Sequence, residues 1–213
     1  MKEDLDIIKL NKKAWDNAAE SYNQESHGKI YTLFNYFCNN LPEEGYILDL
    51  GSGTGLPYAK LLTEKGFKIL GIDISPEMIK IAKKNVPSAQ FKEMSMTDLD
   101  FKEKFDGIFS SYSMLLLNPN LFKETAKKIV HALKPGGLFY LCLNAPWVEG
   151  IDLDKDVIIE FKGRKMYSRP YSKKEILNFF IPLGMKLLKI ENEVITSETW
   201  GKENMNTFIF KLE

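Results

Sequence analysis

The residues Tyr46-Ile47-Leu48-Asp49-Leu50-Gly51-Ser52-Gly53-Thr54-Gly55 decide the fold of this 213-residue chain. A short apolar run bounded by glycines is typical of a buried parallel strand, and the apolar spacing over 56–62 indicates a helix behind it. We therefore predict a strand, a tight turn and a helix. Because glycine adopts positive φ and carries no Cβ, this turn is suited to a ligand that approaches the main chain.

The charge at this turn indicates which ligand it holds. A helix amino terminus normally favours phosphate, because its free N–H groups and its dipole present positive charge. Asp49, however, precedes Gly51 at the end of the predicted strand, where its carboxylate repels a pyrophosphate and attracts a cation. The run 67–75 predicts a second strand that ends in Asp73, at the spacing where an acid binds a ribose diol in βαβ nucleotide folds. A nucleoside that carries an ammonium or sulfonium group satisfies both acids.

At this point the chain resembles the class I S-adenosylmethionine-dependent methyltransferases. Four stretches match the motifs of that family in order and spacing: 47–55, 71–78, 105–111 and 133–139. The resemblance implies an α/β fold with a doubly wound, Rossmann-like sheet of seven strands in the order 3-2-1-4-5-7-6. The last strand is expected to be antiparallel, with helices on both faces, and the implied cofactor is S-adenosyl-L-methionine.

The resemblance also implies which residues bind the cofactor. Ile74 and Met78 are expected to line the adenine slot, and Ser95 stands where many family members have an acid that accepts from the adenine amino group. Strands one and four flank the ligand in a doubly wound sheet, so residues 110–112 are expected to face cofactor and substrate. The expected cofactor-binding residues are Trp15, Tyr22, Asp49, Gly51, Ser52, Gly53, Asp73, Ile74, Met78, Ser95, Met96 and Ser110.

Residues 1–40 are predicted to form a helical amino-terminal lid. Asn11 is expected to cap the first helix, a second helix carries apolar residues from Ile30 to Phe37, and His27 between them is expected to be a solvated loop residue. One face of the first helix carries Ala14, Trp15, Ala18, Ala19 and Tyr22. This face either packs into the core or, as the resemblance implies, covers the cofactor.

Residues 145–170 are predicted to form a hairpin inserted after the fifth strand, with its turn at 162–163, and to overhang the active site. A capping box at 172–175 predicts the next helix. The stretches 185–195 and 206–212 are then the last two strands, which the resemblance pairs antiparallel at one sheet edge.

Composition limits the alternatives. With 44% hydrophobic and 27% charged residues, the chain is typical of one domain spanning 1–213. Lys plus Arg and Asp plus Glu are equal at 29 each, so no overall charge favours nucleic acid or a membrane. The amino terminus does not resemble a signal peptide, and we expect a cytoplasmic protein. Cys38 and Cys142 are expected to be reduced packing residues, and no carboxylate cluster suggests a metal.

The implied reaction is direct in-line transfer of a methyl group to a small-molecule acceptor. A sulfonium methyl is already electrophilic, so alignment supplies much of the rate and a general base is optional. Candidates for such a base are Tyr22, Tyr112, Tyr167 and Tyr171. Arg169 either clamps an acceptor carboxylate or forms a surface salt bridge. The rival functions are a noncatalytic S-adenosylmethionine-binding protein and an NAD(P)-dependent oxidoreductase, which has no use for Asp49 beside its pyrophosphate.

Overall fold

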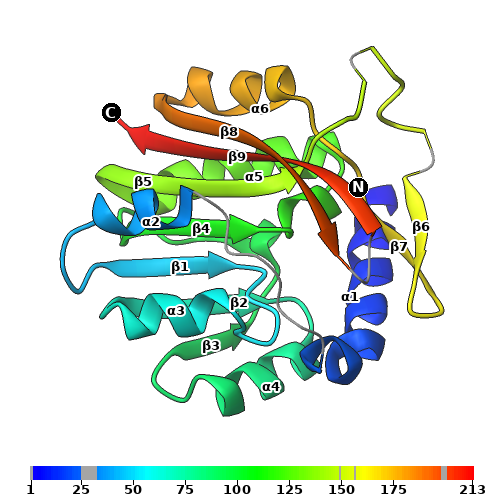
Figure 1. Ribbon diagram of the computed structural model, residues 1–213, viewed down its shortest axis with the longest axis horizontal. Coiled ribbons are helices and arrows are strands. Elements are labelled where there is room, and N and C mark those ends of the chain that lie inside the picture. The colour runs from blue at the N-terminus through cyan, green and yellow to red at the C-terminus, as the bar shows by residue number, and fades with distance from the viewer. Residues whose placement is uncertain (1, 25–32, 149, 156, 198–200) are drawn as a thin grey trace.

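A mixed sheet of seven strands, in the order β3-β2-β1-β4-β5-β9-β8, forms the centre of the computed structural model (Figure 1). The structure describes residues 2–24, 33–148, 150–155, 157–197 and 201–213. The strands of this sheet are β1 (Tyr46–Leu50), β2 (Lys68–Asp73), β3 (Gln90–Glu93), β4 (Phe105–Ser111), β5 (Leu133–Asn144), β8 (Met185–Ser197) and β9 (Gly201–Leu212). A separate hairpin consists of β6 (Ile158–Phe161) and β7 (Arg164–Tyr167).

The predicted strand order is confirmed once the two hairpin strands are left out of the count. Strands β1 to β5 pair in parallel, whereas β9 is antiparallel to both β5 and β8. Strand β1 has the predicted bounds, and Ile47, Leu48 and Leu50 are fully buried because both faces of this central strand are covered. Strand β3 is the shortest of the sheet and begins four residues after Val86, the C-cap residue of α4.

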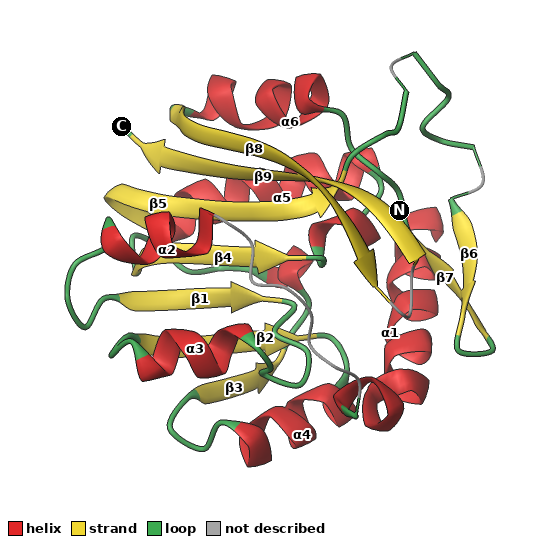
Figure 2. Ribbon diagram, viewed as in Figure 1, coloured by secondary structure: helices red, strands yellow, loops and turns green. Residues whose placement is uncertain are grey.

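Helices cover both faces of the sheet, as Figure 2 shows. The helices are α1 (Lys2–Asn23), α2 (Leu33–Asn39), α3 (Tyr58–Glu64), α4 (Pro76–Asn85), α5 (Pro119–Ala132) and α6 (Lys173–Phe180), with short 3-10 turns at Met96–Asp98, Met114–Leu116 and Ile181–Leu183. One face packs against α2, α3 and α4, and the other against α5 and α6. Within the described ranges, no helix is both long and apolar enough to cross a membrane.

Local capping signals locate several helix starts. Ser75 accepts from the Met78 N–H and Pro76 occupies the first turn of α4. The predicted capping box of α6 is also confirmed, with reciprocal bonds between Ser172 and Glu175. Both cysteines, Cys38 and Cys142, are free and buried, as predicted.

The start of α1 is where the prediction was wrong. The helix begins at Lys2, so Asn11 lies inside it and is not its cap. The buried Asn11 side chain instead donates to the Leu116 carbonyl at 2.9 Å and accepts from the Tyr167 N–H at 2.8 Å. It therefore joins α1 to the hairpin and to the turn after β4. The predicted positions of His27 and Ile30 lie outside the described residues.

Helix α1 lies beyond the sheet, beside the hairpin and at the edge toward which β1, β2 and β4 point (Figure 1). Ala14 and Ala18 pack on Phe161 and Met166 of the hairpin. On the other side Ala19 packs on α4. Trp15 and Tyr22 contact both clusters. The apolar face of α1 is therefore buried between the hairpin and α4, and not against the main sheet.

Candidate functional site

A cavity of about 720 Å³ is lined by residues at the carboxyl ends of the central parallel strands. Strand β1 lies between β2 and β4, so the strand order reverses here, at the place where open α/β sheets bind ligands. Residues of α1, the hairpin and the start of β9 line the same cavity, among them Trp15, Ile159, Met166 and Glu203. The cavity is thus enclosed partly by the sheet and partly by segments distant in sequence.

The three glycines of the first turn have different tasks. All three have positive φ, at 69° for Gly51, 53° for Gly53 and 78° for Gly55. A Cβ on Gly51 would meet the Ser113 Cβ at 2.4 Å, and one on Gly55 would meet a Val86 methyl at 3.1 Å. Only at Gly53, which lines the cavity, would a Cβ meet nothing within 4 Å. Ligand approach therefore explains Gly53, whereas packing explains the other two.

Asp73 lies at the end of β2 and organises this turn. Its Oδ2 accepts from the Gly53 N–H and its Oδ1 from the Ser75 N–H, both at 2.9 Å. The residue is 9% exposed, and its side chain faces the cavity. Burial raises the pKa of Asp73 to about 6, although the N–H donors oppose this increase. Asp16 of α1, which accepts from the Ser75 hydroxyl at 2.6 Å, raises this pKa further.

Asp49 lies at the same edge of the sheet and is only 4% exposed. Burial, and then the charge of Asp73, raise the pKa of Asp49 to about 7. Within the described part of the chain, no lysine, arginine or histidine forms an ion pair with either acid. Two buried carboxylates, one of which is destabilised in its charged form by the other, fit a ligand that brings positive charge.

The other expected cofactor residues also line the cavity, with one exception. These are Trp15, Tyr22, Gly51, Ser52, Gly53, Ile74, Met78, Ser95 and Met96. Trp15 packs edge-on against Tyr22 with 5.4 Å between ring centroids. The buried Trp15 Nε1 has no acceptor in the described chain, so it is a donor available to a ligand. Ser95 is less available than expected, because its hydroxyl caps a 3-10 turn by accepting from the Thr97 N–H.

Ser110 is the exception and needs correction. It is fully buried and lies outside the cavity lining, and its hydroxyl bonds to that of Ser113 at 2.8 Å. The reason is strand alternation: Phe109 and Ser111 face the cavity, so the side chain between them points to the opposite face of β4. Of residues 110–112, Ser111 and Tyr112 line the cavity and Ser110 does not.

Two of the four tyrosines expected as candidate bases line the cavity and two do not. Tyr22 and Tyr112 line the cavity, whereas Tyr167 and Tyr171 do not. The hydroxyl of the fully buried Tyr171 donates to the Leu117 carbonyl at 2.7 Å, and burial raises its pKa. His131 is exposed on α5. Among the described residues, no group of three or more His, Cys, Asp or Glu side chains is placed to hold a metal ion.

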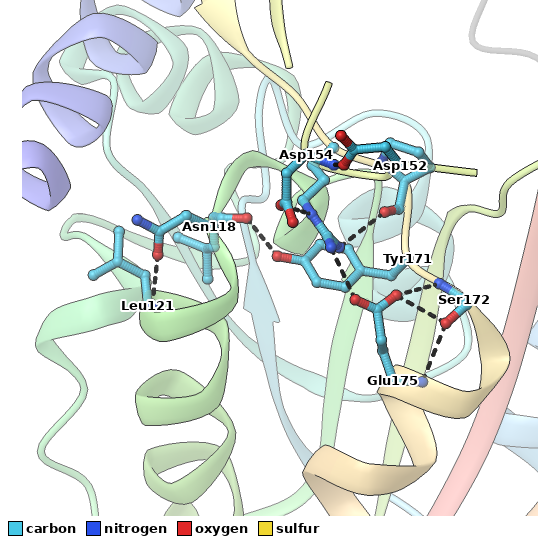
Figure 3. A network of polar contacts seen from close by, with 10 residues as sticks. Asn118, Leu121, Asp152, Asp154, Tyr171, Ser172 and Glu175 are labelled. Carbon is cyan, nitrogen blue, oxygen red and sulfur yellow. Dashed lines mark hydrogen bonds and ion pairs between the residues drawn. The ribbon is translucent and has the colours of Figure 1, made fainter. Parts of the chain in front are cut away.

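Arg169 forms the expected salt bridge, but in a buried position and not at the surface, and it is not placed to clamp an acceptor. It is 3% exposed and lies outside the cavity lining. Its guanidinium donates to Asp154 at 2.7 Å and to Glu175 at 2.9 Å, and lies 4.6 Å from the Tyr171 ring centroid. Figure 3 shows these partners gathered between the inserted segment and α6. Arg169 therefore anchors the insertion to the folded domain.

Sequence reasoning missed the polar residues on the β5–β9 side of the cavity. Asn144 and Glu203 both line it, and the Asn144 Nδ2 donates to the Glu203 Oε1 at 2.9 Å. Glu203 escaped notice because the last strand was expected to start at 206, whereas β9 starts at Gly201. One signal for an earlier start was available in the sequence: the predicted strand 185–195 is longer than its predicted partner 206–212. In the structure β8 pairs with β9 over its whole length.

Comparisons with known proteins agree with this geometry. Residues 47–137 match a family model described as a methyltransferase domain. The chain is 30% identical over 189 residues to a ubiquinone/menaquinone biosynthesis C-methyltransferase of Wigglesworthia glossinidia brevipalpis, and the match covers 80% of this chain and 74% of that protein. A demethylmenaquinone methyltransferase of Chlorobaculum parvum is 33% identical over 98 residues, which cover 46% and 40% of the two chains.

A solved structure is similar over nearly the whole fold. The S-adenosylmethionine-dependent methyltransferase of Methanosarcina mazei superposes with a TM-score of 0.73 at 20% identity, covering 86% of this chain and 98% of that one. The chain spans less than half the length of the first curated relatives that it matches. The Wigglesworthia match, however, extends across three quarters of a relative, and the chain belongs to the S-adenosylmethionine-dependent methyltransferase family that its motifs predicted.

Proposed function

We propose that this protein transfers the methyl group of S-adenosylmethionine to a small-molecule acceptor held in the same cavity. The observation that carries the proposal is the pair of buried carboxylates, Asp49 and Asp73, which face one cavity without a cation from the described chain. A ligand with an ammonium and a sulfonium group relieves their repulsion. A dinucleotide with its pyrophosphate at this turn would increase the repulsion, because it adds further negative charge.

The residues at the turn fit this cofactor. Asp73 keeps lone pairs for ribose hydroxyls beside the open face of Gly53. The buried carboxylate of Asp49, which also lines the cavity, supports a role for it as the acceptor for the ammonium group. Ile74, Met78 and Met96 supply an apolar wall for adenine. The Trp15 Nε1, which has no acceptor among the described residues, is a donor for the ligand's carboxylate. When bound, S-adenosylmethionine supplies an electrophilic methyl group, and the chain's own task is to align the acceptor and exclude water.

We propose one domain over 1–213 in which residues 1–40 act as a lid and 145–170 form an insertion over the site. The contacts of α1 with the hairpin and α4 support this arrangement, because they close the side of the cavity that faces away from the sheet. The cavity volume of about 720 Å³ is in the range of small-molecule sites, roughly 300 to 1,000 Å³, and supports an acceptor of that size. A cytoplasmic location, without nucleic-acid or membrane partners, remains a prediction from composition.

The test is binding followed by turnover. S-adenosylhomocysteine is expected to raise the melting temperature, whereas NAD and NADP leave it unchanged. Methyl-labelled S-adenosylmethionine incubated with metabolite extracts is then expected to yield a labelled small molecule. Asp49→Asn should abolish most of this signal, while Asp100→Asn, an exposed acid outside the cavity, should not. Stabilisation by NAD would support an oxidoreductase, and binding without any turnover would support a noncatalytic binding protein.

A further inference from the structure

A second polar cluster lines the cavity on its β5–β9 side. The Tyr112 hydroxyl donates to Oε2 of Glu203 at 3.2 Å, and Nδ2 of Asn144 donates to Oε1 at 2.9 Å. Tyr112 follows β4, Asn144 ends β5, and Glu203 lies near the start of β9, which runs antiparallel to β5. Three neighbouring strands therefore bring these side chains to one edge of the sheet, beside the end of β1 that carries Asp49.

Glu203 is a buried carboxylate with no compensating cation among the described residues. It is 9% exposed, and both donors to it are neutral. No lysine, arginine or histidine in the described ranges lies within ion-pair distance of it. Its neighbour Lys202 also lines the cavity but is exposed. Removing such a charge from water is unfavourable, and the two neutral donors repay only part of that cost. The carboxylate is therefore available to a ligand.

The backbone at Tyr112 is an independent sign of a built site. Its φ is 57°, which is uncommon for a bulky residue, and its N–H is fixed to the Cys142 carbonyl at 3.0 Å. Strained backbone of this kind persists only where the surroundings hold it, and it is concentrated at binding sites. Here the conformation places Tyr112 on the cavity wall with its hydroxyl on Glu203.

The cavity that this cluster lines has many apolar side chains in its wall. They include Leu115, Leu116, Trp147, Ile159, Met166 and Ile195, while Thr196, Lys202 and Asn204 are the polar lining residues close to Glu203 in sequence or on the paired strand. A carboxylate beside apolar side chains favours a ligand with an apolar body and one head group that donates a hydrogen bond. It disfavours a ligand whose head group is itself an anion, because the two charges repel at close range.

We propose that Glu203 determines which acceptor this protein takes: an apolar molecule whose hydroxyl or amine donates a hydrogen bond to the carboxylate. This inference rests on the proposed function, because it assigns the remaining part of the cavity to the acceptor. Glu203 contacts the head group directly. Tyr112 and Asn144 are positioning residues, since they hold the two carboxylate oxygens.

The experiment uses three probes with one apolar ring system: 2-naphthol, 2-naphthylamine and 2-naphthoate. Their affinities are measured by calorimetry with the whole chain saturated with S-adenosylhomocysteine. The wild-type protein should bind the alcohol and the amine at least tenfold more tightly than the carboxylate. Glu203→Gln should lower affinity for the two donors by about 10-fold to 100-fold, the range expected for loss of a charge-assisted hydrogen bond, and should raise affinity for 2-naphthoate.

Two further variants separate this role from a structural one. Glu203→Asp keeps the charge, so this variant should still bind 2-naphthoate poorly. Its shorter side chain should lower the affinity for 2-naphthol and 2-naphthylamine. Glu160→Gln, the same change on an exposed hairpin residue outside the cavity, should leave all affinities unchanged. S-adenosylhomocysteine binding and a cooperative thermal transition are measured in every variant and serve as the check on folding.

Each outcome decides between the two proposals. If no variant and no wild-type protein binds S-adenosylhomocysteine, the proposed function fails first. If S-adenosylhomocysteine binds but the three probes have the same order of affinity in wild type and Glu203→Gln, Glu203 does not determine which acceptor is taken. The role is also wrong if Glu203→Gln weakens S-adenosylhomocysteine as strongly as Asp49→Asn, because Glu203 then belongs to the cofactor's ammonium group.

Discussion

The two sides of the cavity are built in different ways. The glycine-turn side comes from residues 46–78, a continuous strand-turn-helix-strand-helix unit whose polar groups bond to one another. The opposite side is assembled from α1, the hairpin and the start of β9, so Asn11 meets Tyr167, and Tyr112 meets Glu203, across long stretches of chain. A ligand site whose groups are local in sequence can be found from a motif. A site assembled from distant segments requires the fold.

The largest effect should come from the local side, at Gly51. Gly51→Ala forces a Cβ against Ser113 and leaves a non-glycine residue at φ 69°, so we expect a loss of about 2 to 4 kcal/mol in the free energy of unfolding. Gly53→Ala is the matched control, since its Cβ meets nothing within 4 Å. It should cost about 1 kcal/mol and act mainly on S-adenosylhomocysteine affinity. Denaturant unfolding measures the first effect, and equal losses in both variants would contradict it.

The next effect concerns Asp49. Asp49→Asn removes a buried charge that faces the cavity, so S-adenosylhomocysteine affinity should fall by about 1.5 to 3 kcal/mol, while the free protein becomes more stable. Asp73→Ala should differ, because it also takes the acceptor from the Gly53 and Ser75 N–H groups and therefore loses stability as well. Calorimetry with thermal unfolding separates the two. A less stable Asp49→Asn would show that this carboxylate has a structural partner.

On the distant side, Asn11 should matter through its two long-range bonds. Asn11→Ala leaves the Leu116 carbonyl and the Tyr167 N–H without their partner, and we expect a loss of about 2 kcal/mol in unfolding free energy. The matched control is Asn17→Ala, which removes one exposed bond to the Lys162 carbonyl and should change stability by less than about 0.5 kcal/mol. If both variants melt alike, α1 is not fastened through Asn11.

The smallest effect is a dependence on pH. In the free protein the pKa of Asp49 is raised to about 7, so folding favours its protonated form and stability falls as pH rises from about 4 to 7. A cationic ligand favours the ionised form, so S-adenosylhomocysteine affinity should rise by about tenfold between pH 5.5 and 7.5. Asp49→Asn should flatten much of this rise, and Asp73, with a pKa of about 6, contributes the remainder. Affinity that falls with pH would contradict the charge argument.

The local side was largely predictable because its signals are short range. The glycines, Asp49 and Asp73 follow directly from strand ends, and the caps at Ser75 and Ser172 mark helix starts within one turn. Even there, the prediction for Ser110 was wrong, because one residue of strand register decides whether a side chain faces the cavity or the opposite layer. The motif located the end of β4 but did not show which of its side chains face the cavity.

The distant side was less predictable for physical reasons. Asn11 has the chemistry of a helix cap, and only its tertiary partners show why an asparagine is stable inside α1. Arg169 has the composition of a surface ion pair, but Asp154 and Glu175 approach it from separate segments and bury it. Glu203 lay just before the predicted strand, and its partners come from β4 and β5. In each case the decisive contact is nonlocal.

The bonds of Asn11 have a consequence for how ligands enter and leave the cavity. One side chain ties α1 to the hairpin and to the turn after β4, so α1 and the hairpin, which both cover the cavity, should not move independently. On the hairpin's other flank, Arg169 ties the insertion to α6. Entry and exit should then follow a single concerted opening step, with one exponential phase for cofactor product and acceptor alike. Asn11→Ala should split that phase in two, because α1 and the hairpin would then open with different rate constants.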